Sequence, residues 1–176
     1  NIEKITINSY DDENVLKNYI DSRINNDSPH NQSIKQKLFE MVGDYKGKSI
    51  LDLGCGIGVF AKDFSLIADK VTGIDISKEC IKYAKTHNNS SNIDYICMDI
   101  KDLTSVKDKF DIVFSDMVFN YIKNYDKLLS DIYSLLKDDG IIVFSQVHPI
   151  STASLGESSW IKENDKLKFQ LDNYSN

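Results

Sequence analysis

A glycine-rich segment follows a short apolar run near residue 50. It is the segment Leu51-Asp52-Leu53-Gly54-Cys55-Gly56-Ile57-Gly58. Glycines let a backbone approach a ligand closely and adopt positive φ angles, and a helix that begins behind them offers unpaired N–H groups. A dinucleotide-binding turn, G-x-G-x-x-G, needs glycine at position 59, where this chain has valine. The spacing therefore predicts a ligand-binding turn that is not a pyrophosphate loop, with tight packing alone as the alternative.

Two carboxylates follow at the ends of later apolar runs. Asp75 ends Val71-Thr72-Gly73-Ile74, about twenty residues after the glycine turn, where an acid can accept both hydroxyls of a ribose. Asp99 follows Cys97-Met98 and precedes Ile100, so an adenine could lie between apolar side chains with its amine donating to Asp99. The alternatives are a solvated strand-end acid or helix cap at Asp75, although Ser77 already suits that role, and a helix cap at Asp99.

The elements that would position these residues alternate between two patterns. Strands are predicted at 49–53, 70–74, 93–98, 110–114 and 141–144, and helices at 59–67, 77–86 and 125–137. This alternation predicts an α/β, Rossmann-like fold, with a largely parallel sheet and helices on both faces. Ligands of such sheets bind beyond the carboxyl ends of the strands.

The flanks predict two further parts. Residues 1–45 contain polar helical stretches at 14–23 and 32–42, which predict an N-terminal helical cap over the sheet edge. Residues 46–150 would form the core. Residues 151–176 show one weak strand, at 167–171, and we expect them to be the start of a C-terminal insertion that is truncated here. The last strands of the fold would then be missing.

The combination of motifs resembles class I S-adenosylmethionine-dependent methyltransferases. The resemblance rests on the glycine turn, Gly73-Ile74-Asp75, Met98-Asp99-Ile100 and Phe110-Asp111-Ile112-Val113-Phe114-Ser115. It implies that the turn wraps the methionine portion of the cofactor near Asp52, that Asp75 holds the ribose, and that Ser115 borders the transferable methyl. The full set of cofactor-binding residues is then Tyr19, Arg23, Asp52, Gly54, Cys55, Gly56, Gly58, Asp75, Ile76, Met98, Asp99, Ile100 and Ser115.

A narrower similarity, to a bacterial subgroup of small-molecule methyltransferases, covers both flanks. It rests on Tyr10-Asp11-Asp12 with Tyr19 and Arg23, on Gly47-Lys48, and on Phe144-Ser145-Gln146-Val147-His148-Pro149-Ile150. Arg23 could pair with the cofactor's carboxylate, because a guanidinium suits bidentate recognition, or it could be a surface arginine.

The candidate catalytic residues are three. The subgroup's His-Tyr pair is Asn120-Tyr121 here, which removes one candidate base. His148 is the best remaining base, since an imidazole titrates near neutrality, although a histidine before proline can merely fix a turn. Asn120 and Tyr121 would line the acceptor pocket. Catalysis would consist chiefly of holding nucleophile, methyl carbon and sulfur in line.

Composition restricts the remaining possibilities. The net charge of −6, with lysines scattered among acids, argues against a nucleic-acid partner. Three separated cysteines predict neither disulfides nor a metal site, and no apolar run approaches a membrane span. We therefore expect a cytoplasmic, bacterial transferase that uses S-adenosyl-L-methionine, yields S-adenosyl-L-homocysteine and methylates a small molecule. Its oligomeric state is open. The alternatives are a non-catalytic S-adenosylmethionine-binding module and a nicotinamide-dependent oxidoreductase.

Overall fold

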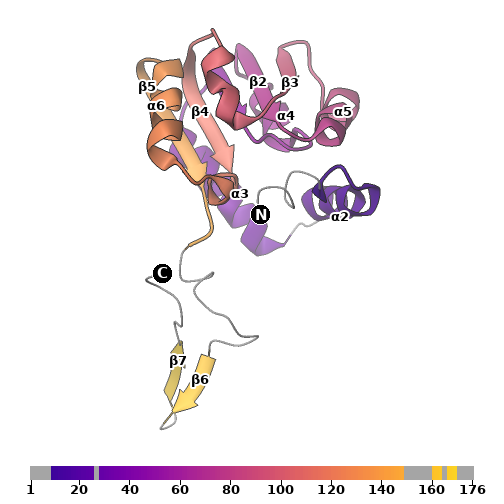
Figure 1. Ribbon diagram of the computed structural model, residues 1–176, viewed down its shortest axis with the longest axis vertical. Helices are drawn as coiled ribbons and strands as arrows, with labels where there is room; N and C mark the ends of the chain where they lie inside the picture. Colours follow the sequence, from indigo (N-terminus) through magenta and orange to yellow (C-terminus); the bar gives the residue numbers. More distant parts are fainter. Residues whose placement is uncertain (1–8, 26–27, 149–159, 164–165, 170–176) are drawn as a thin grey trace. The chain divides into compact units, whose positions relative to one another are not determined.

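The chain divides into two compact units, Asn1–Ser145 and Gln146–Asn176. A computed structural model describes residues 9–25, 28–148, 160–163 and 166–169 (Figure 1). The first unit contains the N-terminal helices together with the sheet. The second contains two short strands, β6 (Trp160–Glu163) and β7 (Lys166–Phe169), which pair with each other in antiparallel orientation.

The first unit is built on a five-stranded, wholly parallel sheet in the order β3-β2-β1-β4-β5. The strands are β1 (Ser49–Leu53), β2 (Lys70–Asp75), β3 (Ile93–Cys97), β4 (Phe110–Asp116) and β5 (Leu136–Ser145). The helices between them are α4 (Val59–Phe64), α5 (Lys78–His87), the 3-10 helices η1 (Ile100–Ser105) and η2 (Phe119–Tyr121), and α6 (Tyr125–Leu135). The predicted Rossmann-like class with a parallel sheet is confirmed.

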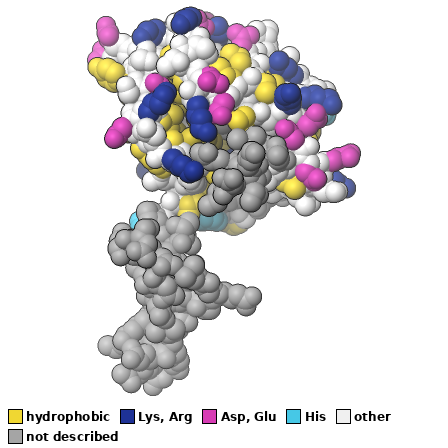
Figure 2. Space-filling view, in the orientation of Figure 1, with side chains coloured by type: hydrophobic (Ala, Val, Ile, Leu, Met, Phe, Trp, Pro, Cys, Tyr) yellow, Lys and Arg dark blue, Asp and Glu magenta, His cyan; other side chains and the backbone are white. Residues whose placement is uncertain are grey.

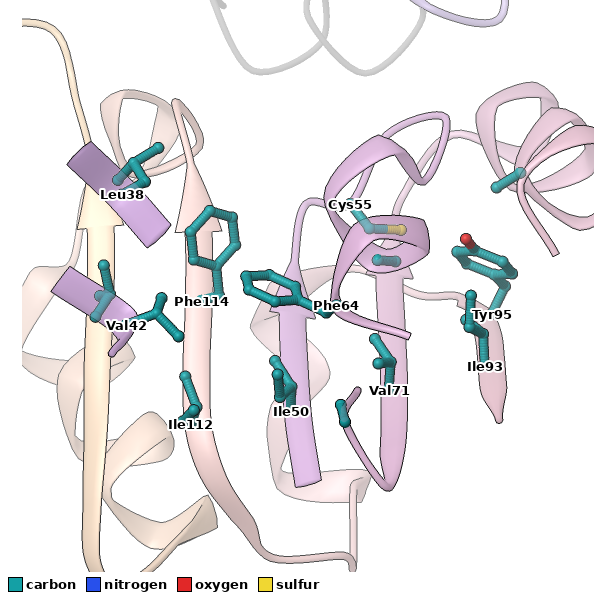
Figure 3. Close-up of a cluster of buried hydrophobic side chains, with 14 of the residues drawn as sticks. Leu38, Val42, Ile50, Cys55, Phe64, Val71, Ile93, Tyr95, Ile112 and Phe114 are labelled. Atoms are coloured by element: carbon teal, nitrogen blue, oxygen red, sulfur yellow. The ribbon is translucent and has the colours of Figure 1, made fainter. Parts of the chain in front are cut away.

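The central strands contribute to two cores because successive side chains point to opposite faces. On one face, residues such as Ile50 and Phe114 pack with α3, α4 and α5 (Figure 3). There the rings of Phe64 and Phe114 meet edge to face, with centroids 5.0 Å apart. On the other face, Leu51 and Val113 pack with η1 and α6. Burial on both faces explains why β1 and β4 are largely apolar, whereas the edge strands β3 and β5 carry exposed polar residues.

Two helices precede the sheet. Helix α2 (Glu13–Ile24) begins at Asp12, whose carboxylate accepts the N–H groups of Asn14 and Val15. Helix α3 (Pro29–Val42) begins at Ser28, with proline in its first position, and ends at Gly43. Helix α3 buries Leu38 and Val42 in the core, whereas α2 buries no residue. Figure 1 shows α2 on the side of the sheet toward which the β4 arrow points.

Three predicted boundaries were wrong around the last strands. Strand β4 runs on to Asp116, two residues beyond the prediction, because Ser115 and Asp116 pair with the end of β5. Helix α6 ends at Leu135 rather than 137, since Leu136 already pairs with Phe110. The register then shifts, and Asp139 adopts a left-handed φ of 63°. Strand β5 therefore begins at Leu136 rather than 141, and residues 138–140, which lie between the predicted helix and strand, form an irregularity within it.

The described surface is mixed in charge. Figure 2 shows lysine and acidic side chains interspersed over the described part of this face. Among the described helices, none is long and apolar enough to cross a membrane. No group of three His, Cys, Asp or Glu side chains within the described ranges could hold a metal ion.

Candidate functional site

The glycine turn joins β1 to α4 and satisfies most of its own N–H groups. Gly54 and Cys55 both donate to the carbonyl of Ile74, at 2.7 and 3.0 Å, and Gly58 donates to Cys55 at 2.9 Å. Gly56 donates to a carboxylate oxygen of Asp75 at 2.8 Å. Because these groups are already bonded within the protein, the turn does not form the anion cradle of a phosphate loop. The structure thus supports the prediction drawn from the missing glycine at position 59.

Glycine is required in the turn for two reasons. Gly54, Gly56 and Gly58 have φ angles of 70°, 53° and 82°, in the left-handed region that favours glycine. In addition, an added Cβ would overlap a neighbouring side chain at each position, namely Val118, Tyr19 and Tyr95 respectively. The sequence predicted that a ligand would approach these glycines closely. In the structure, side chains of the protein itself occupy part of that space.

Asp75 ends β2 and faces the turn. One carboxylate oxygen accepts Gly56 N–H at 2.8 Å and the other accepts Ser77 N–H at 2.9 Å. Burial raises the pKa of Asp75, and these backbone hydrogen bonds oppose the rise. An ionised carboxylate has about four acceptor positions, so both oxygens retain capacity for ribose hydroxyls. Ser77 caps α5 through Cys80 N–H, as the sequence predicted.

Asp52, in β1, is the most buried acid of the site. It is 2% exposed, and its Oδ2 has no hydrogen-bond partner among the described residues. Burial raises the pKa of Asp52 to about 8, and the negative charges of Asp116 and Asp75 add to the rise while Arg23 opposes it. A buried carboxylate oxygen without a partner is costly, and a cationic group beside Oδ2 would offset that cost.

The segment after β3 combines a cap with apolar packing. Asp99 caps η1 by accepting Lys101 N–H at 2.9 Å, which is the alternative that the sequence left open. Met98 and Ile100 are partly buried against the second core, and Met98 N–H donates to the carbonyl of Asp75 at 2.9 Å. Ile76 is 36% exposed. Binding of adenine here stays a prediction.

Two other predicted cofactor residues are buried in the fold. Ser115 has no exposed surface, and its hydroxyl donates to the carbonyl of Leu53 at 2.9 Å, which ties β4 to β1. Cys55 is also buried, and burial raises the pKa of its thiol. In this conformation both residues support the turn from within, and neither is at its surface.

Helix α2 brings Tyr19 and Arg23 to the carboxyl edge of the sheet. Their spacing of four residues places both side chains on one face of the helix. The Tyr19 hydroxyl lies against Gly56, and burial raises the pKa of Tyr19 to about 12. Arg23 donates to Asp116 at the end of β4, with Nη2 and Oδ2 2.8 Å apart. Both predicted residues therefore reach the site.

Sequence reasoning missed two acids at this edge. Asp116 is 8% exposed and accepts Arg23 and, at 2.6 Å, the hydroxyl of Ser145. Asp11 accepts the hydroxyl of Ser77 at 2.7 Å. Asp116, like Asp75, is an acid at the end of a strand, which is the criterion that identified Asp75. It was missed because the predicted strand ended two residues too early. Asp11 had been noted only as part of a motif.

The predicted catalytic residues fall in different parts of the chain. Asn120 and Tyr121 lie in η2, just after β4. Burial is the largest cause of a raised pKa at Tyr10, and Tyr121 adds to it. His148 belongs to the second unit, so its role as a base stays a prediction.

Comparison with known proteins is consistent with this geometry. Residues 44–172 match the family model described as a methyltransferase domain. A protein of Haemophilus influenzae is 31% identical over 177 residues, which cover 96% of this chain and 70% of that protein. A ubiquinone biosynthesis O-methyltransferase of Coxiella burnetii is 31% identical over 65% of this chain, and the match spans 50% of its length.

Solved structures show the same similarity. An S-adenosylmethionine-dependent methyltransferase from Mesorhizobium loti superposes with a TM-score of 0.72 at 28% identity. The match covers 79% of this chain and 64% of that structure.

Proposed function

Because this chain belongs to the methyltransferase domain family, we propose that it transfers the methyl group of S-adenosylmethionine to a small molecule. The observation that carries the proposal is the self-bonded glycine turn with Asp52 and Asp75 at adjoining strand ends. The family membership favours catalysis over the alternative of a non-catalytic binding module. The turn's internal hydrogen bonds and its spacing disfavour a nicotinamide dinucleotide.

The side chains present fit this cofactor. Asp52 Oδ2 is a buried carboxylate oxygen without a partner in the described part of the chain, which suits the ammonium group of a methionine moiety. Arg23 suits its carboxylate, since a guanidinium has five N–H donors. Asp75 would accept the ribose hydroxyls, with Ile76, Met98 and Ile100 beside the adenine and Asp99 accepting its amine.

In this proposal the protein acts by binding and orientation. The cofactor supplies an electrophilic methyl group on a sulfonium. The turn and the strand-end carboxylates fix the cofactor, while Asn120 and Tyr121 in η2 line the acceptor side, so that the acceptor atom is held in line with the methyl carbon. His148 would take the acceptor's proton where the acceptor is a hydroxyl or an ammonium.

The acceptor class follows from the relatives and from charge. The Coxiella relative is named as an O-methyltransferase of ubiquinone biosynthesis, and the net charge of −6 disfavours a nucleic-acid acceptor. We therefore propose a small organic acceptor and a bacterial, cytoplasmic protein. We also retain the proposed division into a helical cap (1–45), a cofactor-binding core (46–150) and a C-terminal segment (151–176).

Calorimetric titration tests the cofactor directly. Wild type should bind S-adenosylmethionine and not NADH, and Asp75→Ala should weaken binding by about 1–3 kcal/mol through loss of a charged acceptor. Asp108→Ala is the matched control, because Asp108 is exposed and pairs with Lys70 at the opposite edge of the sheet. Binding of NADH in preference to S-adenosylmethionine would refute the proposal. Transfer of labelled methyl into a bacterial metabolite extract would then identify the acceptor.

A further inference from the structure

Helix α2 lies at the candidate site with no fully buried residue. Its apolar residues Leu16 and Ile20 are partly buried, whereas Val15 and Ile24 are exposed. Its contacts to the sheet edge are made by Tyr19, which lies against Gly56, and by Arg23, which pairs with Asp116. Because apolar burial is the usual source of helix docking and is incomplete here, we expect these polar contacts to contribute to the docking of this helix.

The Arg23–Asp116 pair is the strongest of these contacts. Nη2 and Oδ2 are 2.8 Å apart, and the Asp116 side chain is 8% exposed. The second oxygen of Asp116 accepts the Ser145 hydroxyl at 2.6 Å, so β5 fixes the carboxylate from the other side. Ser145 also accepts Met117 N–H, at 3.0 Å, where the chain leaves β4 with a left-handed φ of 60°. Asp116 is thus held rigidly before it meets the helix.

The guanidinium retains donors while it is held in this way. Within the described residues, its hydrogen bonds use Nη2 toward Asp116 and Nε toward the Tyr19 hydroxyl, at 3.4 Å. A guanidinium has five N–H donors, and the Arg23 side chain is 35% exposed. Asp116 can therefore orient Arg23 while the remaining donors stay available to an anionic group.

We propose that Asp116 is a positioning residue for cofactor binding, which holds Arg23, and through it helix α2 and Tyr19, against the glycine turn. This inference rests on the proposed function for its ligand. A competing role would give the opposite result. If Asp116 competed with the cofactor's carboxylate for Arg23, removal of Asp116 would tighten cofactor binding.

The test combines two measurements on Asp116→Asn, Arg23→Gln and the double variant. Asp21→Asn is the matched control, because it removes an exposed acid from the same helix. Without ligand, hydrogen exchange of the α2 amides should be about tenfold faster in Asp116→Asn and Arg23→Gln, with β1 and β4 amides unchanged. By calorimetry, each of the two single variants should raise the Kd for S-adenosylmethionine about tenfold. The double variant should have a Kd no higher than that of Arg23→Gln alone.

The outcomes separate the two proposals. Unchanged exchange in α2, or an unchanged or lower Kd for Asp116→Asn, would overturn the positioning role. A wild type that binds no S-adenosylmethionine would instead refute the proposed function, and the exchange measurement would still decide whether the pair holds the helix. If Asp116→Asn exposes the β1 amides and so unfolds, Ser145→Ala supplies the test. It leaves the ion pair's charges in place and should give a smaller change in the same direction.

Discussion

The hydroxyl of Tyr19 lies where a Cβ on Gly56 would be, so the glycine makes room for the side chain that helix α2 delivers. The ring atoms Cζ and Cε1 would be 3.3 and 3.4 Å from that Cβ, which is tight but tolerable. The hydroxyl alone is therefore the main obstacle. This contact links the cap helix to the turn after β1.

Gly56→Ala should destabilise the protein and displace Tyr19. The left-handed φ of 53° costs a residue with a Cβ about 1–2 kcal/mol, and the overlap with Tyr19 adds to that cost. Adding Tyr19→Phe removes the overlapping oxygen, so the double variant should recover part of the lost free energy of unfolding. Urea denaturation of the two single variants and the double variant measures this recovery.

Gly47→Ala is the control for this prediction. Gly47 has a φ of 68°, and its Cβ would meet nothing within 4 Å. It should therefore show the cost of backbone strain alone, about 1–2 kcal/mol, and no benefit from Tyr19→Phe. Equal recovery in both glycine variants would contradict the proposed contact.

Asp111 should stabilise the protein at neutral pH from the edge of the sheet opposite the site. Its Oδ2 accepts Ser49 N–H and Ser49 Oγ, each at 2.8 Å, and Lys137 Nζ at 2.9 Å. Burial raises the pKa of Asp111, but the hydrogen bonds from Lys137 and Ser49 together hold it below its usual range. Asp111→Asn should lower the free energy of unfolding by about 1–2 kcal/mol near neutral pH.

The pH dependence of this loss has a definite sign. A folded-state pKa below the unfolded value of about 4 means that the stabilisation is present above about pH 4 and is lost as the pH falls further. Denaturation at falling pH should show the difference between wild type and Asp111→Asn shrinking. Asp108→Asn, which removes an exposed partner of Lys70, should cost no more than about 0.5 kcal/mol. A loss that stays constant down to the lowest pH at which the protein folds would argue against this assignment.

The sheet and its turn were predictable because local sequence determines them. Short apolar runs predicted all five strands, although β5 begins five residues before its run, and Ser77 predicted the start of α5. The pairing of Leu136 with Phe110 was not predictable, because it depends on a left-handed residue at Asp139 that the turn composition allows without requiring.

The sequence predicted which residues form the candidate site better than it predicted the contacts between them. Spacing identified Asp52 and Asp75, yet it could not show that Asp75 is bonded to Gly56 N–H or that Asp52 Oδ2 lacks a partner. Asp116 was missed because its role depends on Arg23, which lies 93 residues away in sequence. Such long-range polar pairs have no periodic signature along the chain.

Asp52→Asn should change the dependence of stability on pH. Burial raises the folded-state pKa of Asp52 to about 8, whereas the unfolded value is about 4. Between these values the folded protein holds a proton that the unfolded chain has released, so the free energy of unfolding falls as the pH rises and levels off above about pH 8. Asparagine cannot ionise, so this fall should be absent from the variant.

Urea denaturation at about pH 5 and about pH 8.5 measures the difference. The stability of Asp52→Asn relative to wild type should be higher at the alkaline pH, because only wild type then carries a buried charge at this position. Cofactor binding should show the reverse preference, since a ligand ammonium favours the ionised carboxylate. Wild type should bind S-adenosylmethionine more tightly as the pH rises toward 8, and Asp52→Asn should lack that gain. If Asp52→Asn were less stable than wild type by the same amount at both pH values, Asp52 would instead be ionised, with its hydrogen bonds satisfied, at both.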